Sequence, residues 1–357
     1  MKLRVDALTL TRALAPVMRF AKGAQSASGV LIRAEEGVVT LVGTDGTTSV
    51  RTIVPDAQIE EEGVVLVAAR RMYDLAKALQ PEQILLSTTS GALRVKGGQF
   101  AGVLTLMPVG NFPALRDVLG FGVTFDAADF RRAAEQVLPA VSRDETRPQL
   151  QAVKVQEGDG TLVLAAQDGV RVAEATLATE GKFGVRLLPA LVVQEAARAG
   201  VTGLYAEEGT TNVALEGPGF KITTSSLDVD FPDYEKFMPS TYAHVFAADR
   251  EKLMAAVGRV NLLSDDVTAV KVEIDNGKLK ALLTVPGVGE TSETVDLEGE
   301  GAFTAAFKPE LLFDGLEGCA GESVIINVNE PLRPVLFNDT DGYRYLLMPA
   351  RVAKPGE

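Results

Sequence analysis

The chain has 357 residues, of which 46% are hydrophobic and 23% charged, a balance typical of a folded protein with a substantial core. One cysteine and one histidine exclude a disulfide framework, a multi-cysteine zinc site and a histidine-rich metal centre. The net charge of −13 means that the surface as a whole repels nucleic acid, so any contact with DNA needs a local basic patch or a topological link. No segment reads as an export signal or a membrane span, and we therefore expect a cytoplasmic protein without a membrane partner.

Three sequence patterns recur along the chain at intervals of about 120 residues. The first has the composition of a helix start and begins at Val5, Phe125 and Phe246. The second is also typical of a helix start, because proline is well tolerated in a first helical turn, and it aligns Ala69, Pro189 and Pro309. The third is a strand end followed by a turn, at Phe112-Pro113 and Phe231-Pro232.

The repeat predicts three similar domains, and we place them at residues 1–119, 120–241 and 242–357. A unit of about 120 residues is too long for a solenoid repeat, which favours duplicated α+β domains. Each should contain a strand, a helix, several strands, a second helix and further strands. Apolar and β-branched runs that end at turn residues predict strands within 37–46, 160–169 and 277–285.

Six segments are predicted to be helical, and positive charge is concentrated in them. For a single lysine or arginine, solvation of a helix face is the better interpretation. As a set, they favour a basic helical surface that contacts the DNA backbone without reading sequence, which permits sliding. Two segments do not contribute, since 187–198 is neutral and 307–318 is acidic. The predicted helices are 7–22, 67–79, 131–143, 187–198, 248–260 and 307–318.

Five further segments carry a resemblance to a known family: Ala140–Val155, Ala166–Ala173, Asp230–Pro239, Asn329–Phe337 and Tyr345–Val352. In this order they resemble the bacterial DNA polymerase III beta subunit, the sliding clamp. The resemblance implies a DNA clamp fold, with two helices packed on antiparallel sheet in each domain and two chains joined head to tail in a ring. It also implies a processivity factor that encircles duplex DNA, is not an enzyme and needs no cofactor.

The resemblance further implies several partners and an apolar cleft for their peptides. The partners are double-stranded DNA bound without sequence preference, the replicative DNA polymerase, a clamp loader, other polymerases and repair proteins with short peptide motifs, and a second copy of the chain. Apolar residues rimmed by a few cations suit a peptide with aliphatic and aromatic anchors. From the residues alone, Leu347 and Met348 would instead be core residues of a last strand. The matching positions are Leu150, Gly169, Arg171, Val172, Pro232, Lys236, Phe237, Leu332, Pro334, Leu347, Met348, Pro349 and Arg351.

The resemblance also implies residues for ring closure and for contact with DNA. The resemblance pairs the edge strand near Phe100 and Leu104 in the first domain with Leu262 and Leu263 in the third, although packing within the chain explains each of them equally well. Positions that face DNA by the resemblance are Arg70, Arg147 and Lys22; those that rest on the charge argument alone are Arg131, Arg132 and Arg259.

Some positions depart from the family pattern and indicate a divergent member. Val170 stands where the family often has histidine, and residues 25–30 replace a segment that contains Leu-Pro in many relatives. Ala190 and Leu191 stand where some relatives carry a basic pair, and Ala353–Glu357 extends past the usual end.

Two other functions stay open. A carboxylate-based hydrolase is compatible with 48 acidic residues, and a monomeric peptide-binding scaffold would lack ring closure. No phosphate-binding loop, zinc-protease or nucleophile-elbow motif is present in the sequence. His244 and Cys319 are better read as an inert surface histidine and a small buried thiol. The Asp-Gly pairs are turn signals first, and they occur at Asp45-Gly46, Asp168-Gly169 and Asp341-Gly342.

Overall fold

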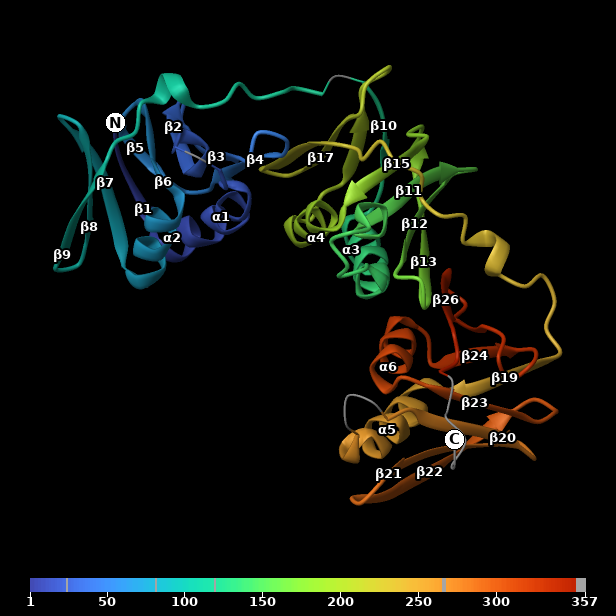
Figure 1. Ribbon diagram of the computed structural model, residues 1–357. Helices are drawn as coiled ribbons and strands as arrows, with labels where there is room; N and C mark the ends of the chain where they lie inside the picture. Colours follow the sequence, from blue (N-terminus) through green and yellow to red (C-terminus); the bar gives the residue numbers. More distant parts are fainter. Residues whose placement is uncertain (24, 81, 119, 265–267, 351–357) are drawn as a thin grey trace. The chain divides into compact units, whose positions relative to one another are not determined.

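The computed structural model describes residues 1–23, 25–80, 82–118, 120–264 and 268–350 and contains antiparallel sheets and six α-helices in that part of the chain (Figure 1). The chain forms two compact units. Unit 1 contains Met1–Ala127, Gly181–Phe183 and Glu195–Ser226, and the remaining described residues form unit 2. The three domain boundaries predicted from the repeat stay a prediction.

Unit 1 is built on two antiparallel sheets. Strands such as β8 alternate between buried and exposed residues, as expected when one face of a sheet packs on a core. The first sheet has the order β5 (Gln58–Glu61), β1 (Lys2–Asp6), β7 (Gln83–Thr89), β8 (Ala92–Gly97) and β9 (Phe100–Thr105). The second has the order β10 (Phe121–Thr124), β16 (Gly203–Ala206), β17 (Asn212–Gly217), β18 (Phe220–Ser225), β4 (Ser49–Val54), β3 (Val38–Thr44), β2 (Gly29–Glu35) and β6 (Gly63–Ala68).

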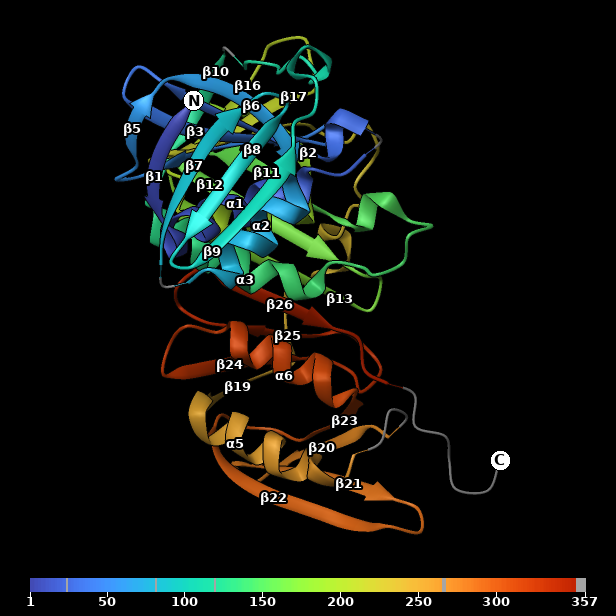
Figure 2. The same cartoon turned by 90° about the vertical axis from the view of Figure 1, so that its left-hand side faces the viewer.

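Helices α1 (Ala7–Phe20) and α2 (Ala69–Ala78) pack side by side in unit 1, and α1 also lies against β3 and β4 (Figures 1 and 2). Helix α1 begins after Asp6, whose carboxylate accepts a hydrogen bond of 2.9 Å from the backbone N–H of Thr9. This cap satisfies one of the N–H groups that the first helical turn leaves unpaired.

Unit 2 contains a twelve-stranded sheet that joins strands far apart in the sequence. Strand β14 (Glu180–Gly181) lies in the chain at the boundary of the two units. The strand order of the twelve-stranded sheet is β15 (Val185–Pro189), β11 (Ala152–Gly158), β12 (Thr161–Gln167), β13 (Arg171–Ala178), β26 (Tyr343–Leu347), β25 (Val335–Asn338), β24 (Ser323–Val328), β19 (His244–Asp249), β22 (Gly289–Glu298), β21 (Lys278–Val285), β20 (Val270–Asp275) and β23 (Phe303–Phe307).

Four more helices follow the chain: α3 (Ala127–Val137), α4 (Ala190–Ala199), α5 (Arg250–Val260) and α6 (Pro309–Gly318). All six predicted helices overlap helices of the structure, but the bounds 131–143 are wrong. Helix α3 begins four residues earlier and ends before a 3-10 turn, Leu138–Ala140, because Pro139 cannot continue an α-helix. Similarly, Pro189 closes β15 instead of opening a helix, whereas Pro309 is the first residue of α6.

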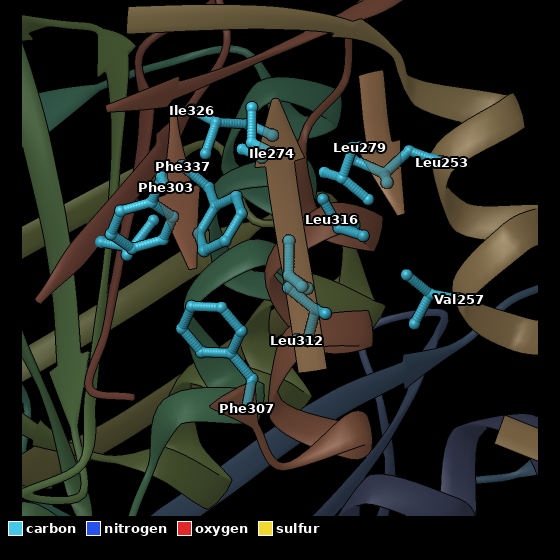
Figure 3. Close-up of a pocket in the computed structure, with 12 residues that line it drawn as sticks. Leu253, Val257, Ile274, Leu279, Phe303, Phe307, Leu312, Leu316, Ile326 and Phe337 are labelled. Atoms are coloured by element: carbon cyan, nitrogen blue, oxygen red, sulfur yellow. The ribbon is translucent and has the colours of Figure 1, made fainter. Parts of the chain in front are cut away.

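The core of unit 2 contains a small internal gap between α5, α6 and the neighbouring strands (Figure 3). Its volume is about 20 Å³, and every side chain around it is apolar, including Leu253, Leu316, Phe307 and Phe337. A space of that size holds at most about one water molecule, and a water needs polar partners. The gap is therefore a packing defect and not a binding site.

Candidate functional site

The ends of three neighbouring strands, β13, β26 and β25, meet in unit 2. Leu347 of β26 pairs with Arg171 on one side and with Val335 on the other. The ladder continues one residue further, because the backbone N–H of Met348 donates to the carbonyl of Val170 at 2.9 Å. Val170 and Met348 expose 44% and 41% of their surface, so two apolar side chains lie exposed next to each other at this edge.

Alternation along these strands separates the predicted cleft residues into two sets. Val172, Leu336 and Leu346 belong to one buried cluster together with Tyr234. Leu347 is also completely buried, but it is not part of this cluster. Because successive side chains of a strand point to opposite faces, Met348 shares a face with Leu346 and not with Leu347. Leu346, which is not among the predicted cleft residues, therefore lies on the same face as Met348, and the exposure that shows this comes from the structure.

The connecting segment 231–242 covers this face of the sheet. The side-chain amide of Gln167 donates to the carbonyl of Pro232 at 2.9 Å, and Phe231, Met238 and Tyr242 pack against the buried cluster. The ring of Phe231 meets that of Tyr234 edge to face with centroids 6.1 Å apart. Aromatic packing of this kind adds to the area that the segment buries.

A buried carboxylate holds the segment in place. Glu174, which is 5% exposed, accepts 2.6 Å from the Tyr234 hydroxyl and 2.8 Å from Nε of Arg344. Burial, reinforced by the charge of Glu174, raises the pKa of Tyr234 far above its usual range, so the phenol stays protonated and remains a donor. The Lys154 ammonium lies 5.5 Å from the centroid of the same ring, within cation–π distance.

Arg171 is part of the interior and not of an exposed rim. Its Nε donates 2.9 Å to Asp168, and its Nη atoms contact Asp314, the Tyr345 hydroxyl and the carbonyl of Pro139. Burial by itself would lower the pKa of Arg171, but Tyr345, Asp314 and Asp168 more than offset that effect and raise it. Arg171 thus connects the 168–171 turn to α6 and to the 3-10 turn after α3.

Gly169 occupies a position in this turn that favours glycine. Its φ is +95°, and a Cβ there would lie 3.5 Å from Nη1 of Arg147. Asp168 accepts from the N–H groups of Val170 and Arg171, which makes this Asp-Gly pair an Asx turn. Arg147 in turn precedes the short helix Pro148–Leu150, in which Leu150 is buried.

The other predicted cleft residues lie mostly at the surface. Phe237 and Leu332 are strongly exposed, and Pro232 is exposed on the segment that covers the sheet. Lys236 is also exposed and forms an ion pair of 3.0 Å with Asp233. Half-buried residues flank the strand ends at Pro334 and Pro349, and Arg351 lies outside the described residues.

Most residues predicted to contact DNA already have an acidic neighbour. Four of the six form ion pairs, which contribute little stability at an exposed surface but reduce the local positive charge. Lys22 is exposed, and Arg131 also has an interaction within the chain. The pairs are Arg70–Asp74, Arg132–Asp129, Arg147–Asp144 and Arg259–Glu293.

The residues predicted for ring closure lie on an edge strand and a short helix. Strand β9 is the last strand of its sheet, with Phe100 exposed and Leu104 half-buried. In unit 2, Leu262 exposes 80% of its surface within the 3-10 helix Asn261–Leu263. An apolar edge strand and an exposed leucine both favour a protein contact.

Cys319 and His244 are the two side chains considered for catalysis. Cys319 is buried, and this burial raises the pKa of its thiol to about 12, which leaves almost no thiolate at neutral pH. Nδ1 of His244 lies 3.2 Å from the carbonyl of Glu300. No helix in the part of the chain that the structure describes is long and apolar enough to cross a membrane.

Comparison with known proteins identifies the family. Models of the DNA polymerase III beta subunit match in order: the N-terminal domain over 1–116, the central domain over 124–233 and the C-terminal domain over 235–351. The beta sliding clamp of Streptomyces coelicolor is 30% identical over 379 residues, covering 99% of this chain and all of that protein. The chain belongs to the DNA polymerase III beta subunit family.

Solved structures agree with this assignment. The beta subunit from Thermotoga maritima superposes with a TM-score of 0.87 at 24% identity and covers 99% of this chain and 100% of its own. The Bartonella birtlesii sliding clamp, solved bound to griselimycin, gives 0.87 at 25% identity with the same coverage. The three-domain clamp fold and the assignment as a non-catalytic sliding clamp are therefore confirmed, and the hydrolase interpretation is wrong.

Proposed function

We propose that two copies of this sliding clamp close head to tail around duplex DNA in the bacterial cytoplasm and tether the replicative polymerase there. The observation that carries the proposal is the match of three clamp domains, in order, over almost the whole chain. The partners are DNA, the polymerase, a clamp loader that opens the ring, and repair proteins or other polymerases that present a short peptide.

DNA is held by enclosure more than by charge. The chain carries −13 overall, and four of the six proposed DNA-facing residues are already ion-paired, so phosphate contacts are few and weak. Weak backbone contacts let the ring slide, because no base edge is read.

Retention on DNA tests enclosure directly. Clamp loaded on a closed circular plasmid should stay bound in moderate salt and should leave within minutes once the plasmid is cut. The uncut plasmid in the same buffer is the control. Equal release from circular and linear DNA would refute the ring and favour the monomeric scaffold.

Ring closure is proposed to pair Phe100 and Leu104 of one copy with Leu262 and Leu263 of the other. Such a contact would cover the free edge of β9, which otherwise offers unpaired backbone groups. The expected solution mass is about twice the chain mass of 37.8 kDa, by a head-to-tail pairing of two copies. Leu262→Asp should yield the monomer, whereas Val185→Asp, at another exposed apolar residue of unit 2, should remain a dimer.

Partner peptides are proposed to bind the exposed apolar edge beside Val170 and Met348. Met348 suits a site shared by many partners, because its flexible side chain adapts to different anchors. The wall of the site consists of Val172, Leu346 and Leu150, with Phe237 and Leu332 as outlying contacts.

Truncation of two residues tests this site. Met348→Ala combined with Leu150→Ala should weaken binding of a polymerase C-terminal peptide at least about tenfold, the size expected for central interface residues. The dimer mass should not change. Met348→Ala alone separates lost contact from any destabilisation by the buried Leu150, and loss of the dimer would mean that the site is misassigned.

A further inference from the structure

Unit 1 contains an open pocket that none of the proposed sites uses. It has a volume of about 460 Å³, within the range of small-ligand sites and far above the space of one water molecule. Helix α1 forms one wall and the end of α4, from Glu195 to Ala199, forms another. The floor is the junction of β4 and β18, where Ile53 N–H donates 2.8 Å to the carbonyl of Gly219.

The lining of this pocket is positively charged on an acidic protein. Three guanidinium groups, those of Arg12, Arg19 and Arg198, surround one carboxylate, Glu195. The lining thus carries two excess positive charges, while the chain as a whole carries −13. Another open pocket of similar size, about 400 Å³ beside α5, has four carboxylates and two cations and shows the opposite balance.

Glu195 orients two of the three arginines. It is only 4% exposed and accepts from Nη1 of Arg19 and, at 3.0 Å, from Nη1 of Arg198. Burial lowers the pKa of Arg19, and the nearby charge of Arg198 lowers it further. Arg12 is exposed and forms no hydrogen bond or ion pair among the described residues.

We propose that this pocket holds a phosphate group between Arg12 and Arg198, with Arg19 fixed behind them by Glu195. A guanidinium carries five N–H donors in a planar fork, and that geometry matches the oxygens of a phosphate. Ile53 and Phe220 of the floor and Pro16 of α1 add apolar contacts, which suit the sugar or the carbon skeleton attached to the phosphate. The phosphate belongs either to the backbone of the enclosed duplex or to a free phosphate compound, and the duplex source rests on the proposed function.

Two binding measurements distinguish the sources. Calorimetry with inorganic pyrophosphate reports free phosphate, and fluorescence anisotropy with a labelled linear duplex of about 24 base pairs at low salt reports backbone phosphate. The double variant Arg12→Gln, Arg198→Gln should bind its ligand at least about tenfold more weakly. For the duplex, the slope of log K against log salt should fall by about 0.9 for each lost phosphate contact.

A charge-matched control is available in the same unit. Arg33→Gln, Arg94→Gln also removes two positive charges, from exposed positions on β2 and β8, and should change either affinity less than twofold. Glu195→Gln provides a second test in the opposite direction. It removes the only carboxylate of the lining and should raise the affinity several-fold at low salt.

Each outcome decides the proposal. Loss of pyrophosphate binding alone assigns a free compound, and loss of duplex binding assigns the DNA backbone. The proposal is overturned when the wild-type chain binds neither ligand, or when the control weakens binding as much as the pocket variant does. Retention of the pocket variant on circular DNA is measured separately, so failure of the pocket leaves the ring intact as a hypothesis.

Discussion

A buried glutamate paired with arginine occurs in each of the two units, and the two pairs have different roles. Glu174 of unit 2 and Glu195 of unit 1 are 5% and 4% exposed, and each accepts hydrogen bonds from arginine. Glu174 also binds the Tyr234 hydroxyl below an apolar cluster, so its network closes a segment over a sheet. Glu195 lies beside an open pocket and orients arginines toward it. A carboxylate below an apolar cluster thus fixes a segment, whereas a carboxylate beside an open pocket orients charged side chains toward solvent.

The largest effect is expected from Glu174→Ala. The Tyr234 hydroxyl would lose its buried acceptor and Arg344 its carboxylate, which should lower the free energy of unfolding by about 3 kcal/mol. Urea unfolding followed by tyrosine fluorescence measures the change. Glu298→Ala, at an exposed position of β22 in the same unit, should stay within about 0.5 kcal/mol of the wild type.

Tyr234→Phe removes the hydroxyl and keeps the ring, so it isolates the hydrogen bond from Tyr234 to Glu174. The net value of a single hydrogen bond is about 1 kcal/mol, and opening of segment 231–242 should become about fivefold more frequent. Limited trypsin digestion after the exposed Lys236 would report this opening. An unchanged cleavage rate would mean that apolar packing alone holds the segment.

Glu195→Gln should contrast with both Glu174→Ala and Tyr234→Phe. Its arginine partners are partly exposed, so the loss of stability should be only about 1 kcal/mol. The phosphate affinity of the pocket should rise in the same variant, whereas Glu174→Ala should leave it unchanged. A fall in phosphate affinity in Glu195→Gln would show that orientation of the arginines matters more than the removed charge.

The smallest effect concerns two carboxylates that cap equivalent helices of the repeat, the half-buried Asp6 and the exposed Asp249. Hydrogen bonds from Thr9 lower the pKa of Asp6, and those from Lys252 lower that of Asp249. A lowered pKa in the folded state means that this stability is present above the unfolded pKa of about 3.9 and is lost as the pH falls through the lower folded value. When the free energy of unfolding is measured as the pH is lowered, Asp6→Asn should not show the part of this loss that comes from α1. Asparagine also caps helices, but it does not ionise in this pH range.

Several features of the fold and site could be predicted from local sequence. Strands at 38–44, 161–167 and 278–285 lie within the predicted runs, and all six helices follow the positions that the repeat marked. The error at 131–143 arose because the charge of Arg143 was counted as helical although Pro139 stops α3. The ion pair of Arg70 with Asp74 was also readable, because residues four apart on a helix are neighbours.

Other features depended on residues that are distant in the sequence. The sequence could not show that the Arg171 side chain is only 10% exposed, because its partners Asp314 and Tyr345 come from the other end of the chain. It also could not select Leu346 over Leu347, since both are apolar and only the face covered by Tyr234 distinguishes them.

By itself, the sequence determined a threefold repeat, its helices and turns, an acidic chain without catalytic motifs, and a family resemblance. These properties follow from short-range rules of periodicity, capping and composition. Only the tertiary structure decided which charges became buried pairs and which line a pocket. Arg19 and Glu195 are 176 residues apart, and Glu174 and Arg344 are 170 apart. Such pairs form because distant strands and helices pack together, and that packing sets the burial which makes one carboxylate fix a segment and the other present arginines to solvent.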